Sequence, residues 1–286
     1  MYLYGRYTRG RELSTDRNKK LLFTDLDGTL LSTDKTVSAG NLAAVNEMVA
    51  RGHKFVIATG RPLKSALMIS ESYGWNRDGF YISSYNGGLI YDCGSGKDIF
   101  VRGMKKEDVK YILDKAHEAG IHAHTYSRTH VVSEYDTCEL NRYVKGIKMP
   151  KMVVDDIISY LTEDPIKAIV ISDEGRERLN SFRESIDSFC EGRYTYTFSN
   201  PIFLEYSNIN ASKGMSLKIM AGLYDIPMED TIACGDEEND LSMVQAAGVG
   251  AVMANGTDFM KKRADYVTRA DNDHDAIAEV IERFIL

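Results

Sequence analysis

The sequence predicts a doubly wound, Rossmann-like α/β core with a parallel sheet, interrupted by an inserted α+β cap domain. In the first and last parts of the chain, patterns of buried strands alternate with patterns of helices, as in parallel βαβ units. In the middle, strands come in adjacent pairs with helices between them, as in α+β domains. We therefore expect a core from residues 20–85 and 210–286 and a cap from residues 86–209, with lengths normal for domains.

The first part of the expected core contains two strands and two helices. The apolar run of residues 21–23 predicts a buried strand. Ser38 then stands where a helix N-cap belongs, and apolar residues follow at helical spacing until Gly52. Residues 55–58 predict the next buried strand, and Pro62 suits the first turn of the helix after it. This order favours a parallel sheet.

The remaining elements divide into a mixed middle part and a second α/β part. In the cap, which we expect to open at the turn signal Asn86-Gly87-Gly88, the pattern indicates strands near residues 89–91, 99–101, 121–126, 131–133 and 168–172, helices over residues 105–119 and 176–189, and a hairpin across Asn200-Pro201. Back in the core, it indicates helices over residues 213–224, 240–247 and 275–284 and strands over residues 231–234, 251–253 and 266–268.

Composition excludes several classes of protein. The 286-residue chain has a formal net charge of -7, which disfavours nucleic acid or an anionic membrane as its main partner. No apolar run approaches the roughly 20 residues of a membrane span. The four cysteines are far apart and form no CxxC pair, so we expect reduced thiols in a cytosolic protein. Residues 1–19 lack the apolar stretch of a secretory signal, and we interpret them as an N-terminal extension outside the fold.

Four short polar motifs stand at strand ends or at a helix start of the predicted core. They are Asp25-Leu26-Asp27-Gly28-Thr29-Leu30, Thr59-Gly60-Arg61, Lys213-Gly214 and Gly235-Asp236-Glu237-Glu238-Asn239-Asp240. In a doubly wound sheet, ligands bind beyond the carboxyl ends of the strands. We therefore expect these motifs, which are distant in sequence, to converge on one pocket.

The residue types in these motifs suit phosphoryl chemistry. Several carboxylates in one pocket repel each other and need a cation or a shared proton. Carboxylate oxygens suit Mg²⁺, which binds through one or two carboxylates together with substrate phosphate and water. A lysine can bind phosphate as a point charge. One aspartate can act as a covalent nucleophile, and a second, two residues away, can protonate the leaving oxygen and then activate water.

The four motifs, in this order, resemble those of the haloacid dehalogenase superfamily. The similarity covers the chain from about Lys20 to the end. The large insert between the second and third motifs looks like the cap of the Cof-type branch. Asn86-Gly87-Gly88 and Phe203-Leu204-Glu205-Tyr206 resemble that branch as well. The resemblance implies a Mg²⁺-dependent phosphatase with a cap that closes over the pocket and selects the leaving group.

The resemblance implies catalytic and metal-binding roles for five acidic residues. Asp25 would attack phosphorus and form an aspartyl-phosphate. Asp27 would be the general acid and base, and would offer its backbone carbonyl to the metal. Asp236 would bind Mg²⁺ directly, with Asp240 close behind and Glu237 contributing to the metal shell. The implied metal set is therefore Asp25, Asp27, Asp236, Glu237 and Asp240.

The resemblance also implies a set of phosphate-binding and substrate-binding residues. Thr59 and Lys213 would bind the phosphoryl group and steady the nucleophile, while the backbone N–H groups of Leu26 and Gly60 would donate to it. Asn239 would help to orient the phosphate. Arg61 either reaches the phosphate or leaving group or braces its loop, and Asn86 either faces the substrate or only forms the turn.

Two histidines of the cap stand outside these motifs. His122 and His124 are two residues apart and would share one face of a cap strand. A metal site is one interpretation, but the sequence shows no third ligand. We expect instead that this face is exposed or contacts substrate.

The function that we expect is hydrolysis of small phosphomonoesters, with sugar phosphates as the class that the resemblance implies. Two alternatives stay open. A phosphotransferase or phosphomutase would use the same aspartyl-phosphate with an acceptor hydroxyl in place of water. A catalytically idle phosphosugar-binding protein would use the same fold, although Asp25, Asp27 and Asp236 are all present. The expected partner is a small phosphomonoester, with neither nucleic acid nor membrane.

Overall fold

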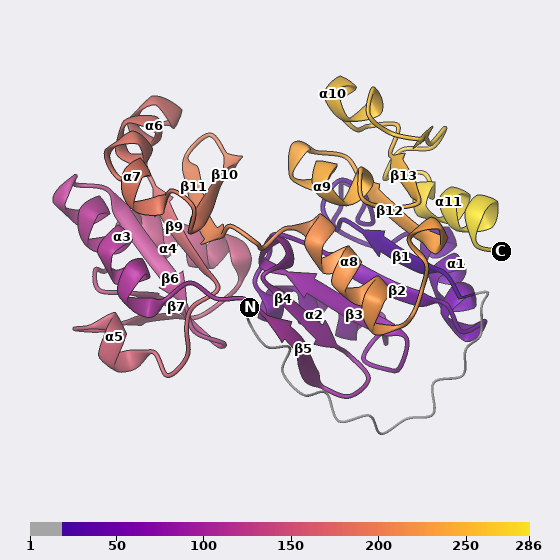
Figure 1. Cartoon of the computed structure of the whole chain (residues 1–286), viewed down its shortest axis with the longest axis horizontal. Coiled ribbons are helices and arrows are strands. Elements are labelled where there is room, and N and C mark those ends of the chain that lie inside the picture. The colour runs from indigo at the N-terminus through magenta and orange to yellow at the C-terminus, as the bar shows by residue number, and fades with distance from the viewer. Residues whose placement is uncertain (1–18) are drawn as a thin grey trace.

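The computed structural model describes residues 19–286, which form a core and a cap (Figure 1). The expected N-terminal extension therefore lies, except for residue 19, outside the described residues. The core contains an eight-stranded sheet in the order β14-β13-β12-β1-β2-β3-β4-β5. Its strands are β1 Leu21–Thr24, β2 Lys54–Ala58, β3 Phe80–Ser84, β4 Leu89–Asp92, β5 Lys97–Val101, β12 Thr231–Gly235, β13 Val249–Val252 and β14 Tyr266–Val267.

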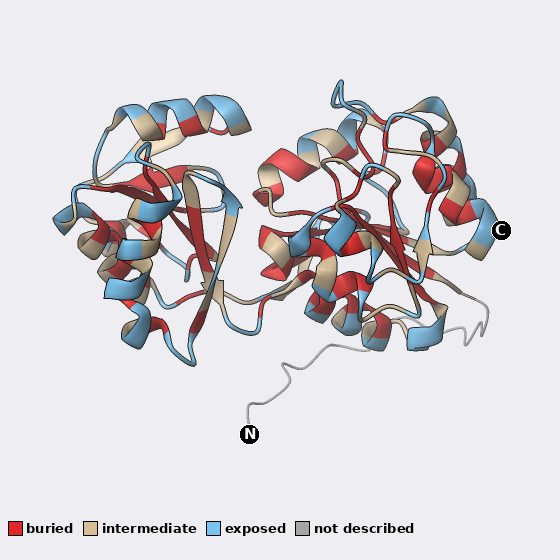
Figure 2. Cartoon of the chain, turned by 90° about the horizontal axis from the view of Figure 1, so that it is seen from above, coloured by how far each residue is buried: buried red, intermediate tan, exposed pale blue. Residues whose placement is uncertain are grey.

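Helices cover both faces of this sheet, which confirms the doubly wound fold. Leu22 on β1 packs into a cluster with the helices of one face, and its neighbours Leu21 and Phe23 pack into another cluster with the helices of the opposite face. The first face carries α1 Ala39–Ala50, α2 Leu63–Ser72 and α11 Ala276–Phe284, and the second carries α8 Lys213–Leu223 and α9 Leu241–Val244. The central strands β1, β2, β3 and β12 are almost entirely buried between these layers (Figure 2).

The register of the central strands aligns the ends that carry the motifs. β1 lies between β12 and β2 and is parallel to both, with Thr24 opposite Cys234 on one side and Ile57 on the other. The residues that follow these three positions therefore emerge at the same edge of the sheet. This alignment brings the first, second and fourth motifs together, as the sequence predicts.

The cap contains a six-stranded sheet in the order β10-β11-β9-β6-β7-β8. Its strands are β6 His122–Tyr126, β7 Val131–Ser133, β8 Lys151–Val153, β9 Lys167–Ile171, β10 Tyr194–Asn200 and β11 Phe203–Asn208, and its helices are α3 Lys106–Glu118, α4 Cys138–Ile147, α5 Ile157–Tyr160, α6 Arg176–Ser185 and α7 Asp187–Cys190. One face of the sheet packs with α3 and α6. The opposite face packs with α4 and shares a hydrophobic cluster with the core.

The boundary of the core differs from the expected one. The hairpin of β4 and β5 was expected in the cap, but β4 pairs antiparallel with β3 and extends the core sheet. The short connection through residues 85–88 returns the chain beside β3, so pairing there completes the hydrogen bonds of that edge. The cap sheet and its helices occupy residues 106–208, later than the expected start at residue 86.

Several short elements were not expected from the sequence. They are β3, α4, β8, α5 and α10 Asp258–Lys261. β3 also lies in the core sheet, beside β2, so that its end stands next to the second motif. No helix within residues 19–286 has both the length and the apolar character needed to cross a membrane.

Candidate active site

Lys213 links two of the carboxylates at the carboxyl edge of the core sheet. It is the first residue of α8, after the N-cap Ser212, whose hydroxyl accepts from the backbone N–H of Met215. Its Nζ lies 2.5 Å from Oδ1 of Asp25 and 2.6 Å from Oδ1 of Asp240. Lys213 is only 1% exposed, so these ion pairs form in a region shielded from water and are screened little by salt.

Three acidic residues form one buried cluster. Asp25, Asp236 and Asp240 each place a carboxylate oxygen within 4.8 Å of the others. Burial raises the pKa of Asp25, and the nearby charges of Asp240 and Asp236 raise it further, against the opposing effect of Lys213. Burial likewise raises the pKa of Asp236 to about 6. One ammonium does not fully offset three buried carboxylates, so the cluster favours an added cation.

The donor atoms of this cluster fit Mg²⁺. Its ligands are all hard carboxylate oxygens, which Mg²⁺ prefers. Asp236 accepts from the hydroxyl of Thr29 at 2.7 Å through Oδ1, a contact that orients its carboxylate. Asp240 is used differently, because its Oδ2 accepts from the backbone N–H groups of Asp236 and Glu237 at 3.0 and 3.2 Å. Asp240 therefore holds the loop after β12 in place through these backbone contacts, and it also pairs with the ammonium of Lys213.

Gly28 allows the first and fourth motifs to approach each other. Its φ of +80° is in the left-handed region, and a Cβ there would lie 2.3 Å from Oδ2 of Asp236. A larger residue at this position would be strained at this φ and would displace the Asp236 carboxylate. The glycine that follows Asp27 is therefore required by packing of the site, and not only by a turn.

Arg61 and Lys35 hold the carboxylate of Asp27. Arg61 donates from Nε and Nη2 to the two oxygens of Asp27, both at 2.7 Å, and Lys35 Nζ donates at 2.9 Å. Burial alone would raise the pKa of Asp27, but the hydrogen bonds from Arg61 and Lys35 outweigh it and lower the pKa below its ordinary value. The structure places Arg61 in a bidentate pair with Asp27, and its contact with a phosphate or leaving group stays a prediction.

Asn86 lies beside the second motif. Its backbone is left-handed, with φ of 55°, and its N–H donates to the carbonyl of Thr59 at 3.0 Å. A Cβ on Gly60 would lie 3.1 Å from the Asn86 side-chain oxygen Oδ1, which is buried and has no hydrogen-bond partner among the described residues. Asn86 thus forms the turn and also presents an unused acceptor next to the Thr59-Gly60-Arg61 loop.

Three other expected site residues occupy different surroundings. Leu26 is fully buried in the core, while Glu237 and Asn239 are exposed on the loop after β12. Glu237 caps the short 3-10 helix of residues 238–240 in a reciprocal capping box with Asp240. Neither Glu237 nor Asp27 belongs to the cluster of three carboxylates.

Sequence reasoning missed Thr29, Lys35 and Lys167 as parts of this region. Lys167 begins β9 of the cap and donates to the carbonyl of Gly60 at 3.0 Å. A signal for it exists in the sequence, because Lys167 directly precedes the apolar run of residues 168–171. In the structure the residue opens β9 and is 2% exposed. A lysine is rarely buried unless it has a partner.

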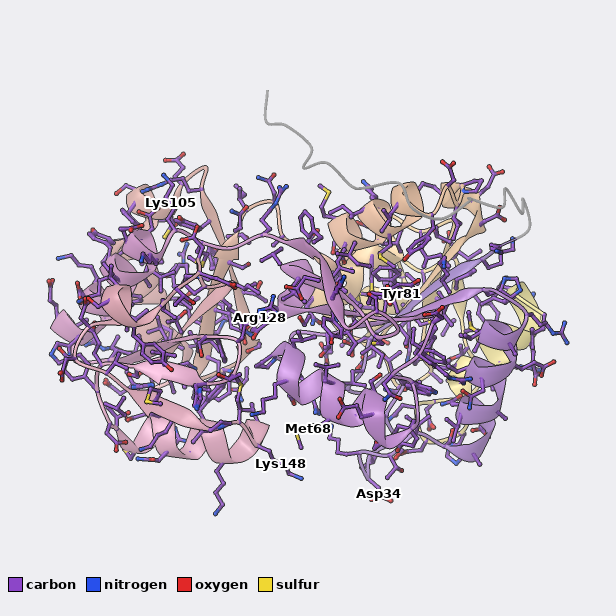
Figure 3. The ribbon with its side chains drawn as sticks, turned by 90° about the horizontal axis from the view of Figure 1, so that it is seen from below. Asp34, Met68, Tyr81, Lys105, Arg128 and Lys148 are labelled. Atoms are coloured by element: carbon purple, nitrogen blue, oxygen red, sulfur yellow. The ribbon has the colours of Figure 1, made fainter. Side chains whose placement is uncertain are left out.

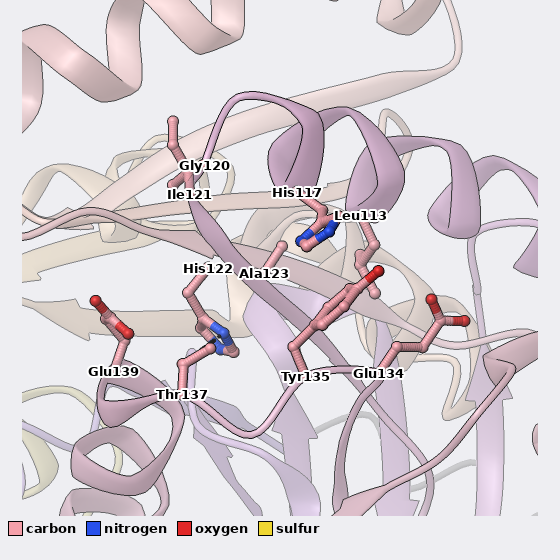
Figure 4. Close-up of a pocket in the computed structure, with 10 residues that line it drawn as sticks. All are labelled: Leu113, His117, Gly120, Ile121, His122, Ala123, Glu134, Tyr135, Thr137 and Glu139. Atoms are coloured by element: carbon pink, nitrogen blue, oxygen red, sulfur yellow. Dashed lines mark hydrogen bonds between the residues drawn. The ribbon is translucent and has the colours of Figure 1, made fainter.

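The two cap histidines are not exposed. His122 Nε2 lies 3.0 Å from His124 Nδ1, and His122 Nδ1 lies 2.9 Å from the Thr137 hydroxyl. Both side chains are buried, against the expectation of an exposed face, because the unexpected helix α4 covers this end of β6. His122 borders a cap cavity of about 220 Å³, in which His117 stacks on Tyr135 (Figure 4).

A larger cavity, of about 450 Å³, lies between the cap and the core. Leu63 and Tyr85 line it from the core. Leu63 lies two residues after the second motif, and Tyr85 directly precedes Asn86. Tyr126 and Arg128 line it from the cap, and Arg128 lies at the junction of the two domains (Figure 3), where it pairs with Asp98. The arrangement leaves room for a small molecule near the Thr59-Gly60-Arg61 loop.

Comparison with known proteins identifies the family. The model of the haloacid dehalogenase-like hydrolases matches residues 22–281. The chain belongs to this family. It is 30% identical over 274 residues to a provisionally named phosphatase of Streptococcus pyogenes serotype M6, covering 93% of this chain and 98% of the relative. The match shows that the protein is a hydrolase built on the haloacid dehalogenase fold.

Three further proteins are similar to this hydrolase in sequence or in fold. A 5-amino-6-(5-phospho-D-ribitylamino)uracil phosphatase of Bacillus subtilis is 28% identical over 274 residues, covering 95% of this chain and 98% of its own. A crystal structure of a haloacid dehalogenase-like hydrolase from Bacteroides thetaiotaomicron is 30% identical, with a TM-score of 0.85 and coverage of 93% and 99%. In fold, the chain also resembles a sugar phosphatase of subclass IIB, at 22% identity and a TM-score of 0.76. At this level of identity, the likeness to the sugar phosphatase concerns the fold alone.

Proposed function

We propose that the protein is a Mg²⁺-dependent phosphomonoesterase for small phosphorylated metabolites, with Asp25 as the nucleophile. The observation that carries this proposal is the buried cluster of Asp25, Asp236 and Asp240 with Lys213 among them, at the carboxyl edge of the core sheet. This arrangement provides a nucleophilic carboxylate, a cation site and a phosphate-binding ammonium within one small space. The family membership of the chain agrees with it.

In the proposed reaction, the Asp25 carboxylate attacks phosphorus and the bond to the leaving oxygen breaks. Asp27 gives its proton to that oxygen, and then takes a proton from the water that hydrolyses the aspartyl-phosphate. Lys213 and Thr59 hold the phosphoryl oxygens, and Asp240 keeps Lys213 in position. Mg²⁺, held by Asp25 and Asp236, would neutralise charge on the phosphoryl group.

The substrate class that we propose is a phosphorylated sugar or polyol. The cavity between the cap and the core is large enough for a leaving group of this size and is lined by Leu63 and Tyr85, which lie close in sequence to the second motif and to Asn86. The relatives include phosphatases named for a phosphoribityl compound, and a structural neighbour is named a sugar phosphatase. A phosphotransferase with the same aspartyl-phosphate remains the second candidate, because the same pocket would serve an acceptor hydroxyl.

Phosphate release from a panel of sugar, polyol and aryl phosphomonoesters tests this function. We expect release by the wild type with Mg²⁺, loss of release with EDTA, and no release by Asp25→Asn, which keeps the shape of the side chain without its nucleophilic charge. Equal release by Asp25→Asn and wild type would exclude Asp25 as the nucleophile. Transfer to an added sugar acceptor in place of phosphate release would favour the phosphotransferase.

A further inference from the structure

One buried cation of the cap reaches the phosphate-binding loop of the core. Nζ of Lys167, at the start of β9, lies 3.0 Å from the carbonyl oxygen of Gly60. The same Nζ lies 3.0 Å from Oε2 of Glu205 on the neighbouring strand β11. Both side chains are buried, with Lys167 2% and Glu205 7% exposed. Burying an ion pair costs desolvation energy, so the pair is weak evidence for a stabilising role. The contact of Lys167 with one specific carbonyl therefore suggests a role in the site.

The surroundings of this ammonium fix its position. Glu205 is held from its other oxygen, because Oε1 accepts from the hydroxyl of Ser199 at 2.7 Å. The ammonium also faces two aromatic rings, at 5.9 Å from the centroid of Tyr85 and 5.7 Å from that of Tyr126. One ring comes from the core and the other from the cap, and they pack edge to face. Lys167 therefore lies at the seam where the two domains meet.

The carbonyl that Lys167 binds belongs to a peptide that also holds a phosphate-binding residue. This peptide joins Gly60 to Arg61, and its N–H donates to the hydroxyl oxygen of Thr59 at 3.1 Å. A cation on a peptide carbonyl strengthens the N–H of that peptide as a donor, because hydrogen bonds in a chain polarise each other. When the Thr59 oxygen accepts this bond, the hydroxyl hydrogen is left to donate to a phosphoryl oxygen.

We propose that Lys167 is a positioning residue for the hydrolytic reaction, through which the cap orients the Thr59-Gly60-Arg61 loop for phosphoryl transfer. The inference rests on the proposed function of the same site. Because the contact is made to the loop backbone, its effect applies to every substrate, whatever the leaving group. The cap thus contributes to the rate of the chemical step in addition to selecting substrates.

Kinetics of three variants test this role. Lys167→Met removes the charge but leaves Glu205 buried without a partner, which threatens folding. The double variant Lys167→Met with Glu205→Gln removes both charges and keeps the volume. Because it leaves no buried charge unpaired, we expect it to fold, and its kinetics test the role of Lys167. Lys167→Arg keeps a donor with positive charge. Lys145→Met, on an exposed position of α4, is the control for loss of a cap lysine.

We expect the double variant to unfold near the wild-type temperature but to lose about ten- to a hundredfold in kcat/KM. The loss should lie mainly in kcat and be the same factor for p-nitrophenyl phosphate and for sugar phosphates. Lys167→Arg should recover part of the activity, and Lys145→Met should match the wild type.

Three results would overturn the inference. A folded double variant with wild-type kcat would show that Lys167 only stabilises the cap, while the proposed function would stand. A loss confined to some leaving groups would make Lys167 a specificity residue instead. Wild type that releases no phosphate from any panel member would remove the proposed function, and this inference with it.

Discussion

At the scale of single residues, the proposed mechanism would place two opposing requirements on the protonation of Asp27. A general acid must carry a proton when the leaving oxygen needs it. The hydrogen bonds from Arg61 and Lys35 favour the charged form, and they lower the pKa of Asp27 against the effect of burial. Arg61 is tied to the second motif, whereas Lys35 comes from an exposed loop. The contact of Lys35 with Asp27 can therefore be removed without changing the Thr59-Gly60-Arg61 loop.

Lys35→Met should raise the pKa of Asp27 and shift the pH profile. Activity that depends on protonated Asp27 falls as pH rises through its pKa, so a higher pKa moves this alkaline limb of kcat/KM to higher pH. The measurement is the pH profile of both proteins with a sugar phosphate. With p-nitrophenyl phosphate, whose leaving group needs little protonation, the limb should stay in place. An unchanged limb for the sugar phosphate would argue against Asp27 as the acid.

The residues of the site differ in how far sequence alone could place them. Asp25, Asp236 and Thr59 follow strands that end at one edge, so their convergence could be predicted from strand order and motif. The pairing of Asp27 with Arg61 and that of Lys167 with Gly60 could not, because these contacts depend on how side chains and domains pack after folding. These contacts can be known only from the folded structure.

At the scale of elements, α8 is placed by its close contact with the loop and helix after β12. A Cβ on Gly214, the second residue of α8, would lie 2.1 Å from the carbonyl oxygen of Ser242. We expect Gly214→Ala to destabilise the protein by about 1–3 kcal/mol, because the backbone of one helix must shift. Since α8 begins with Lys213, the shift should also lower kcat. Denaturant unfolding and steady-state kinetics measure the two effects.

Gly222, near the other end of α8, provides the matched control. A Cβ there meets no atom within 4 Å, and the residue is exposed. Gly222→Ala should therefore stabilise the protein by about 0.5–1 kcal/mol, because alanine loses less backbone entropy in a helix. Its kcat should equal that of the wild type. Similar losses in both variants would show that the contact with Ser242 does not explain the effect of Gly214→Ala, because helix propensity alone favours alanine at both positions.

The strand β6 carries a pH-sensitive pair, His122 and His124. Burial lowers the pKa of His122 to about 4, from an ordinary value of 6.5. In the unfolded chain the residue binds a proton at higher pH, so its contribution to stability is complete above pH 6.5 and is lost as pH falls toward 4. The loss is roughly 3 kcal/mol at most. His122→Gln, which cannot titrate, should show a flatter decline in unfolding free energy over this range, and parallel declines would contradict this origin.

Elements near the histidines show why the cap was harder to predict than the core. The two-residue spacing correctly placed both histidines on one face of a strand. The helix that buries this face, α4, was not expected from the sequence, and it has only Leu140 and Tyr143 buried among its ten residues. The core helices α8 and α11 bury five or more residues each and were predicted close to their observed bounds.

At the scale of the whole molecule, the cap and the core share one hydrophobic cluster, and the cap has a second cluster of its own. The cap face with Tyr126 and Tyr143 belongs to the same cluster as Leu63 and Tyr85 of the core. The opposite cap face, under α3 and α6, forms a separate cluster of cap residues. A ligand bound at the carboxyl edge of the core sheet should therefore affect the shared side of the cap and leave the far side unchanged.

Mg²⁺ should protect the molecule from hydrogen exchange in this graded pattern. At neutral pH we expect slower exchange in the loops that follow β1 and β12 and at the start of α8, because the cation relieves repulsion among Asp25, Asp236 and Asp240. The amides of α3 and α6 should exchange at the same rate with and without Mg²⁺. Asp236→Asn should abolish the protection. Since the pKa of Asp236 is about 6 without metal, protons compete with Mg²⁺ below that pH, and the gain in melting temperature from Mg²⁺ should shrink there. Protection that is uniform over both domains would show instead that the metal stabilises the chain as one cooperative unit.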